Sequence, residues 1–248
     1  MAFPVDQFVL FGDSLTERSF LVDRNGWGLQ LCQAYIRKVD IINRGYGGYN
    51  TDWCIQILPR ILHSAAKSAT KIKLFTIFLG ANDATIPEAK HHVPLKQYEV
   101  NLKAMVQMVR SADPETRIVL LTPPPLDDAA WKAFREAQGE SLDRGMQTTK
   151  VYRDVCLEVA KSENVVCLDT WPVFLDAYLT PGPEFAGLFD DGLHFSASGN
   201  QRLFDALFAL IGASWPDLRP ENMPHILPFW RDVDTSNVEK SLFGKWEL

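Results

Sequence analysis

The chain has 248 residues, of which 46% are hydrophobic and 23% charged, and its formal net charge is −6. This length suits one α/β domain and buries a core without disulfide staples. The negative charge, with no cluster of Lys and Arg, excludes binding to a nucleic-acid backbone as the main role.

Short apolar runs alternate with longer stretches of helical period along the chain. The expected elements, in chain order, are a strand at Phe8–Phe11, a helix at Trp27–Lys38, a strand at Val39–Ile42, a helix at Asp52–Ala66, a strand at Ile72–Leu79, a helix at Leu95–Ala112, a strand at Ile118–Leu121, a helix at Met146–Lys161, a strand at Val165–Leu168 and a helix at Gly199–Ile211. Pro59 is expected to kink its helix or to end the first half of it. The alternation predicts a three-layer α/β/α, flavodoxin-like fold with a five-stranded parallel sheet and right-handed crossovers.

The last part of the chain, 214–248, differs from the preceding 1–213. It is broken by prolines but carries large apolar side chains, namely Trp215, Ile226, Leu227, Phe229 and Trp230. Disordered tails are poor in such residues, and soluble proteins seldom leave so many of them exposed. We therefore expect one domain at 1–213 and a C-terminal extended arm at 214–248. The arm packs either on its own domain or on a partner subunit in a homodimer.

The first residues, the apolar runs and the cysteines indicate the cellular compartment of the protein. Residues 1–6 lack the basic start and apolar run of a secretory leader, and no run reaches the roughly 18 apolar residues of a membrane span. The four cysteines, Cys32, Cys54, Cys156 and Cys167, are scattered, which favours reduced thiols over a disulfide framework or a zinc site. These features predict a cytoplasmic protein with no membrane partner.

Ligand sites in open parallel sheets lie beyond the carboxyl ends of the strands, so the segments that follow the strands are informative. Ser14 follows the first strand, where a helix would begin, and a hydroxyl there is exposed above a helix N-terminus. The alternative is that Ser14 only caps the helix, with Glu17 completing a capping box. Ser14 is therefore a candidate nucleophile.

Two further segments can supply hydrogen-bond donors. The glycine cluster in Asn43–Thr51 follows the second strand and can expose backbone N–H groups, although a tight turn explains it equally well. It lacks the ending of a P-loop and the spacing of a dinucleotide fingerprint. Asn82 follows the third strand, and its side-chain amide is suited to stabilise an oxyanion, with an Asx-turn as the alternative.

Asp191 and His194 follow the fifth strand and are one turn apart. A bend at Gly192 can bring the carboxylate to Nδ1 of the imidazole, which is the arrangement that a general base for a serine requires. The other histidines are less suited, since His63 lies on a surface helix face, His91 and His92 in a charged, solvated loop, and His225 among prolines. The sequence therefore predicts Asp191 and His194 as partners of Ser14.

Taken together, these blocks resemble the SGNH or GDSL hydrolases. The matching blocks are Gly12-Asp13-Ser14, Gly48, Gly80-Ala81-Asn82-Asp83 and Asp191-Gly192-Leu193-His194. Further segments are similar to the isoamyl acetate-hydrolysing esterase subfamily, namely Asn25–Gly28, Asn43–Thr51, Phe78–Asp83 and Leu227–Val233. Gly47 departs from the pattern, because many relatives carry serine there, but a backbone N–H donor survives that change.

The resemblance implies a catalytic triad of Ser14, Asp191 and His194. It implies an oxyanion hole formed by the backbone N–H groups of Ser14 and Gly48 and the amide of Asn82. The implied activity is a carboxylesterase acting on short-chain, acetate-like esters of small apolar alcohols, with no metal or organic cofactor. A thioesterase, lysophospholipase or carbohydrate deacetylase on the same scaffold remains an alternative, as does a non-catalytic binding protein. No GxSxG motif encloses a serine, which argues against the α/β-hydrolase fold.

Overall fold

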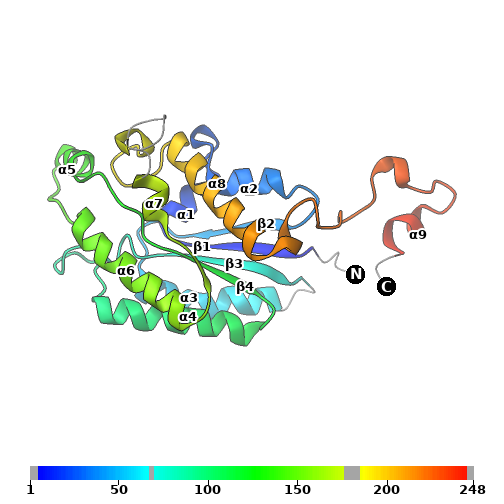
Figure 1. Ribbon diagram of the computed structural model, residues 1–248, viewed down its shortest axis with the longest axis horizontal. Helices are drawn as coiled ribbons and strands as arrows, with labels where there is room; N and C mark the ends of the chain where they lie inside the picture. The colour runs from blue at the N-terminus through cyan, green and yellow to red at the C-terminus, as the bar shows by residue number, and fades with distance from the viewer. Residues whose placement is uncertain (1–4, 67–69, 176–184, 245–248) are drawn as a thin grey trace.

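The computed structural model describes residues 5–66, 70–175 and 185–244. Within them, five strands form one parallel sheet in the order β2-β1-β3-β4-β5 (Figure 1). The strands are β1 Gln7–Gly12, β2 Asp40–Gly45, β3 Ile72–Phe78, β4 Arg117–Leu121 and β5 Val166–Leu168. This strand order is that of flavodoxin-like sheets, so the predicted fold class is confirmed.

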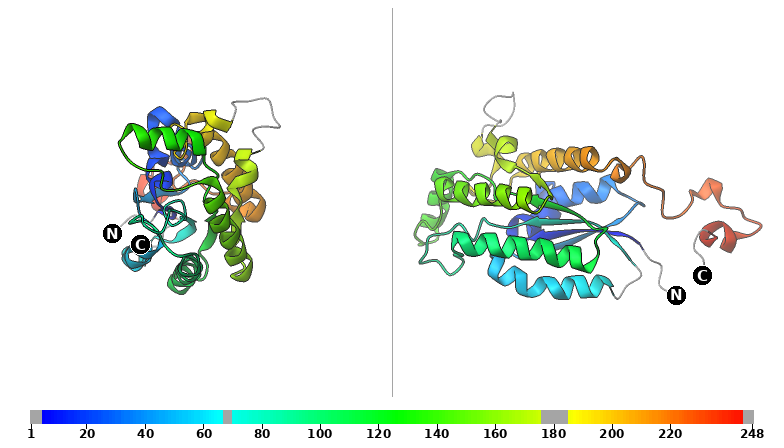
Figure 2. Two further views of the ribbon diagram at one scale, coloured as in Figure 1. Left: turned by 90° about the vertical axis from the view of Figure 1, so that its left-hand side faces the viewer. Right: turned by 60° about the horizontal axis from the view of Figure 1, so that its bottom comes forward.

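Helices cover both faces of the sheet (Figures 1 and 2). The helices are α1 Ser14–Glu17, α2 Trp27–Ala34, α3 Thr51–Ala66, α4 Leu95–Ala112, α5 Asp128–Ala137, α6 Met146–Ser162, α7 Thr170–Leu175, α8 Ala197–Ser214 and α9 Val238–Phe243. Helices α3, α4 and α6 pack on one face, and α2, α7 and α8 on the other. Short 3₁₀ turns lie at Arg18–Phe20, Val22–Arg24, Phe185–Leu188, Pro216–Leu218 and Trp230–Asp232.

The central strands are apolar on both faces because both are covered. In β1, Phe8 and Leu10 belong to the core beneath α2 and α8, whereas Val9 and Phe11 belong to the core beneath α3, α4 and α6. All four side chains are buried. Successive side chains of a strand point to opposite faces, so a continuous apolar run places one half in each core.

Three features of the elements differ clearly from those expected. Strand β2 continues to Gly45, in register with β1 up to Gly12, so part of the predicted glycine loop is strand. Helix α2 ends at Ala34 instead of Lys38, and the backbone of Arg37 has a left-handed φ of 62°, which cannot continue a helix. Helix α3 runs through Pro59 to Ala66, so the expectation that Pro59 could end it is wrong. Its buried apolar face, which includes Leu58, holds the helix together despite the missing N–H.

The segment after α8 is attached to the domain at its base. Lys38 Nζ donates to the carbonyl of Met223 (2.5 Å), and the N–H of Ile226 donates to the carbonyl of Arg37 (2.9 Å). Arg37 also donates to the carbonyls of Leu227 and Pro228. Beyond this point the described part of the chain extends away from the sheet to α9 (Figures 1 and 2).

The large apolar side chains of 214–244 differ in their exposure to solvent. Trp215, Ile226 and Leu227 are half-buried, whereas Phe229 and Trp230 are 46% and 79% exposed in the single chain. Whether this segment packs on a partner subunit stays a prediction. None of the described helices is both long and apolar enough to cross a membrane.

Candidate active site

The predicted site residues converge at the carboxyl edge of the sheet. Ser14 begins α1 directly after β1, Gly48 follows β2, and Asn82 follows β3. Asp191 and His194 lie in the turn before α8. Parallel strands end at the same edge, so segments far apart in the chain meet there.

Ser14, His194 and Asp191 form a continuous hydrogen-bonded series. His194 Nε2 lies 2.9 Å from Ser14 Oγ, and His194 Nδ1 lies 2.6 Å from Asp191 Oδ2. The other carboxylate oxygen of Asp191 accepts from the backbone N–H groups of Leu193 (3.0 Å) and His194 (2.8 Å). The turn depends on Gly192, whose φ of 93° lies in the left-handed region.

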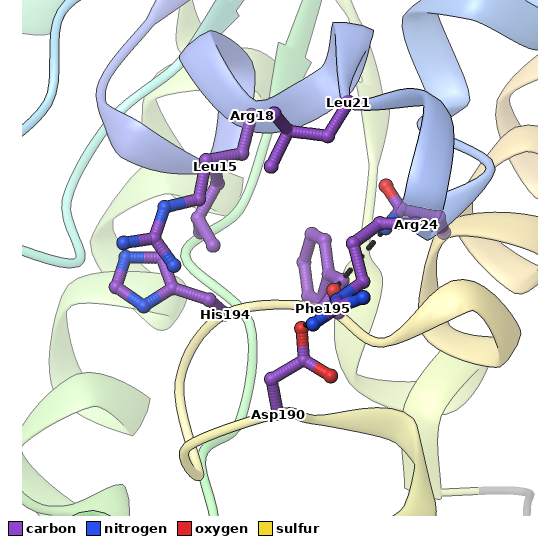
Figure 3. A pocket seen from close by; sticks show the side chains of 8 residues that line it. Leu15, Arg18, Leu21, Arg24, Asp190, His194 and Phe195 are labelled. Carbon is purple, nitrogen blue, oxygen red and sulfur yellow. Dashed lines mark hydrogen bonds and ion pairs between the residues drawn. The ribbon is translucent and has the colours of Figure 1, made fainter.

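The charge on Asp191 determines which proton His194 carries. Burial opposes ionisation, but the hydrogen bond and charge of His194 and two backbone N–H groups outweigh it, so the pKa of Asp191 is lowered. An ionised carboxylate accepts the Nδ1 proton, which leaves Nε2 as the acceptor that faces Ser14 Oγ. Arg18 Nη1 lies 3.9 Å from Asp191 Oδ2, and Figure 3 shows its guanidinium beside the His194 ring.

The local structure around Ser14 shows that this serine is not the helix cap. Asp13 is the N-cap of α1, and its Oδ1 accepts from the N–H of Leu15 (2.9 Å). Glu17, which the capping-box alternative assigned to the same turn, accepts instead from the N–H of Gly47 (2.8 Å). The hydroxyl of Ser14 is therefore engaged by His194 rather than by the helix.

Gly48 and Asn82 lie in segments that are tied to each other. Gly48 has a φ of 77°, and its carbonyl accepts from His91 Nδ1 (2.8 Å). Asn82 Nδ2 donates to the carbonyl of the neighbouring Tyr49 (2.8 Å), which uses one of its two N–H groups. The second N–H of the amide remains for a ligand, which is what an oxyanion donor needs.

Several contacts of this site were not predicted. Arg144 Nη1 donates to Asn82 Oδ1 (3.2 Å), and nothing in the sequence around Arg144 signals that contact. The His91-His92 pair, which was expected to be solvated rather than to bind a metal, is only partly exposed. Both rings are half-buried, and His92 Nδ1 binds the carbonyl of Thr85 (2.6 Å) as His91 binds that of Gly48.

Two carboxyl groups are fully buried next to the site. Burial raises the pKa of both Asp13 and Asp83 to about 7. Asp83 Oδ1 accepts from the N–H (3.0 Å) and the hydroxyl (2.5 Å) of Thr51, which opposes the shift. Their second oxygens, Asp13 Oδ2 and Asp83 Oδ2, have no hydrogen-bond partner among the described residues.

A small cavity adjoins His194. Its volume is about 20 Å³, and Leu15, Leu21 and Phe195 form apolar parts of its wall (Figure 3). An ion pair between Arg24 Nε and Asp190 Oδ2 (2.5 Å) lines another side. The described residues contain no cluster of three His, Cys, Asp or Glu side chains placed to hold a metal ion.

Three features together define an SGNH-type hydrolase: the order of the strands, the position of the site at the carboxyl edge of the sheet, and the Ser14–His194–Asp191 contacts. Residues 10–202 match the model of the GDSL-like lipase/acylhydrolase family, and the chain belongs to this family as a carboxylic ester hydrolase. It is 39% identical to the isoamyl acetate-hydrolyzing esterase 1 homolog of Homo sapiens, over 96% of this chain and 92% of that protein. It is 34% identical to the isoamyl acetate-hydrolyzing esterase of Saccharomyces cerevisiae, over 94% and 98% respectively.

The fold is also similar to solved structures. One is an acetylxylan esterase from Geobacillus stearothermophilus, with a TM-score of 0.62 and 22% identity over 86% of this chain and 97% of that one. At this identity the likeness supports the fold alone.

Proposed function

We propose that the protein is a serine carboxylesterase that hydrolyses short-chain, acetate-like esters of small apolar alcohols. The observation that carries the proposal is the series Ser14 Oγ, His194 Nε2 and Nδ1, and Asp191 Oδ2, with contacts of 2.9 and 2.6 Å. In this arrangement a base can take the proton of a nucleophile while a carboxylate stabilises the resulting imidazolium.

The proposed reaction has two halves. Ser14 Oγ attacks the ester carbonyl as His194 takes its proton, and the tetrahedral intermediate collapses when His194 gives that proton to the departing alcohol. Water then attacks the acyl-enzyme with the same proton transfers, which releases the acid and restores Ser14. Asp191 keeps its charge throughout and holds the imidazole in place.

The oxyanion of each intermediate is proposed to be met by the backbone N–H groups of Ser14 and Gly48 and by the side-chain amide of Asn82. The left-handed backbone of Gly48 and the spare N–H of Asn82 support this role.

The substrate class rests on the similar proteins. The relatives at 39% and 34% identity are named for hydrolysing isoamyl acetate. A lysophospholipase, which needs a long acyl groove, is one alternative. A thioesterase or carbohydrate deacetylase remains an alternative on the same scaffold.

Ser14→Ala tests the proposal. We expect the variant to stay folded and to lose hydrolysis of p-nitrophenyl acetate by about 10⁴-fold or more. Ser162→Ala, on the exposed end of α6, is the matched control and should keep full activity. Labelling of the wild type by a fluorophosphonate, abolished only in Ser14→Ala, distinguishes an enzyme from a non-catalytic binding protein.

A panel of p-nitrophenyl esters from acetate to palmitate tests the substrate class. We expect kcat/KM to be highest for the shortest acyl groups and to fall steadily with chain length. A preference for palmitate, or for thioesters of the same acids, would assign the site to one of the alternatives while leaving Ser14 as nucleophile.

We further propose that the arm, 214–248, packs on a second copy of the chain in a homodimer and lines its substrate pocket. The base of the arm is bonded to its own domain through Arg37, which also contacts the Phe229 ring, whereas Trp230 beyond it is 79% exposed. An extended apolar arm that leaves its own domain is suited to reach another subunit.

A further inference from the structure

A buried group of three side chains lies between Asn82 and His194, and we call it the Trp131 cluster. Its members are Trp131, Asp143 and Arg144, which are 4%, 6% and 7% exposed. Arg144 donates from Nε to Asp143 Oδ1 (3.2 Å) and from Nη2 to Asp143 Oδ2 (3.1 Å). Trp131 Nε1 donates to Asp143 Oδ1 (2.9 Å), and the guanidinium of Arg144 lies 5.1 Å from the Trp131 ring centre.

The cluster fixes the position of a charged group that ordinarily avoids burial. A guanidinium stays protonated, so its burial requires a paired carboxylate and satisfied N–H groups. Burial opposes ionisation of Asp143, but Arg144 and Trp131 outweigh it, and the pKa of Asp143 is lowered. The two-pronged contact with Asp143 and the stacking on Trp131 leave Arg144 little freedom to move.

The remaining nitrogen of Arg144, Nη1, is directed at the Asn82 segment. It donates to the carbonyl of Ala81 (2.9 Å) and to the side-chain Oδ1 of Asn82 (3.2 Å). A guanidinium only donates, so the atom of the Asn82 amide that it contacts must be the oxygen. Nδ2 is therefore held on the opposite side, where it donates to the carbonyl of Tyr49.

These contacts have two consequences for the amide. Its orientation is fixed at both ends, so its spare N–H has one direction. A cation on the oxygen also draws electron density from the nitrogen, which makes the N–H a stronger donor, as in other hydrogen-bonded chains. Both effects strengthen an interaction with negative charge that develops during the reaction.

We infer that Arg144 is a positioning residue for ester hydrolysis, because it orients and polarises the Asn82 amide that meets the oxyanion. This inference rests on the proposed function of Asn82. Arg144 is separated from the reacting atoms by that amide on one side and by the Trp131 ring, 6.4 Å from the His194 ring, on the other. The inference is that its effect on turnover passes through Asn82.

A neighbouring arginine provides a matched control. Arg135 Nη2 lies 3.9 Å from Asp143 Oδ2, and its guanidinium lies 6.0 Å from the Trp131 ring centre. It therefore contacts the same cluster, but its other ion pair is with Glu140 at the surface rather than with Asn82. Changes at Arg135 disturb the cluster without touching the amide.

The experiment is a double-mutant cycle between Arg144→Lys and Asn82→Ala, measured with p-nitrophenyl acetate. Lysine keeps the buried charge, but its single ammonium group cannot bind both carboxylate oxygens of Asp143 and Asn82 Oδ1 at the same time. We expect Asn82→Ala to lower kcat by about 10²–10³-fold and Arg144→Lys by about 10-fold or more, each with KM nearly unchanged. In the Asn82→Ala background, Arg144→Lys should have almost no further effect on kcat.

Each other outcome has a definite meaning. If Arg144→Lys lowers kcat by the same factor in the wild type and in Asn82→Ala, Arg144 has a purely structural role and the inference is overturned. The inference is also overturned if Arg144→Lys lowers kcat no more than Arg135→Lys does. Wild-type kcat in Arg144→Lys overturns it while leaving the proposed function intact. Wild-type kcat in Asn82→Ala instead refutes the oxyanion role of Asn82.

A second variant covers the case in which Arg144→Lys does not fold. The paired change Asp143→Asn with Arg144→Gln removes both charges together and leaves no unpaired ion. We expect this variant to fold, with a kcat lowered through the same dependence on Asn82. Wild-type kcat in the folded paired variant would overturn the inference.

Discussion

The two ring nitrogens of His194 have different partners, and the difference decides how activity should depend on pH. Nδ1 faces the carboxylate of Asp191, whose pKa is lowered, and Nε2 faces the hydroxyl of Ser14. Only the neutral imidazole can accept a proton from Ser14. Asp191 remains charged over the whole range in which imidazoles titrate.

We therefore expect kcat/KM to fall when the pH is lowered from about 8 to 5, because a protonated imidazole cannot accept the proton of Ser14. The measurement is a pH profile for p-nitrophenyl acetate in buffers of constant ionic strength. A flat profile over this range would exclude His194 as the base.

Asp13 and Asp83 make the stability of the fold depend on pH. Their pKa values are raised to about 7 by burial, so the folded protein holds protons there that the unfolded chain has already lost. Between about pH 4 and 7 the folded state binds more protons than the unfolded state, and the free energy of unfolding therefore falls as pH rises. Above about pH 7 both carboxyl groups are ionised in the folded state too, so they no longer change the free energy of unfolding with pH.

Asp83→Asn tests this dependence, because the amide oxygen can still accept from Thr51 and carries no charge at any pH. We expect the stability of the variant relative to wild type to increase between pH 5 and pH 8, by on the order of 2–4 kcal/mol. Urea unfolding at both pH values measures it. The exposed Asp205 on α8 is the control: Asp205→Asn should show no such trend, and a trend equal in both variants would refute the explanation.

At the scale of elements, the turn that carries Asp191 and His194 is held against α5. The N–H of Asp127 donates to the carbonyl of Gly192 (2.8 Å), and the side chain of Asp127 caps α5 by accepting from Ala129 and Ala130. A Cβ atom on Gly192 would lie 2.4 Å from the backbone nitrogen of Trp131. The close approach of turn and helix thus requires glycine at this position.

Gly192→Ala should displace the turn, because both the left-handed φ and the contact with backbone atoms oppose a side chain. We expect a loss of stability of about 2–4 kcal/mol and a fall in kcat of about 10²-fold, since His194 shifts relative to Ser14. Thermal unfolding and kcat are measured on the same sample.

Gly139 provides a control for Gly192, because it has the left-handed backbone without the close packing. Its φ is 73°, but a Cβ atom there would meet nothing within 4 Å. Gly139→Ala should cost about 1 kcal/mol and leave kcat unchanged. Equal effects on kcat in the two variants would contradict the explanation by close packing.

At the scale of the whole molecule, the arm is the segment that is proposed to form the homodimer. Its base is held by the turn after α2, where Arg37 donates to the carbonyls of Leu227 and Pro228. Trp230 lies beyond this attachment and is 79% exposed, whereas the Phe229 ring lies 4.8 Å from the Arg37 guanidinium. Removing the chain after Pro228 therefore removes the exposed part and this one ring contact, and keeps the hydrogen bonds of the base.

We expect the full-length protein to be a dimer at micromolar concentration and the chain truncated after Pro228 to be a monomer. Light scattering measures the molar mass, and kcat/KM on the two forms reports whether the arm lines the pocket. Trp230→Ser should weaken the dimer without changing the fold. A monomeric full-length protein would refute the dimer and leave the arm with its own domain.

The sequence alone determined the sheet, the layers and the candidate residues. Alternating apolar runs and helical periods are local properties, so β1 to β5 and helices α3, α4, α6 and α8 lie close to where they were expected. Asp191 and His194 are three positions apart, so one bend at Gly192 suffices to join them. Ser14, Gly48 and Asn82 each follow a strand, which places them at one edge of a parallel sheet.

The tertiary structure alone decided which side chains support those residues. Arg144 contacts Asn82 across 62 positions, and His91 contacts Gly48 across 43. The end of α2 depends likewise on the turn at Arg37, which also binds the distant arm. Such contacts leave no periodicity or spacing in the sequence, because they arise only when loops from different strands are packed against each other. Local patterns therefore specify the elements, while packing specifies the partners that orient them.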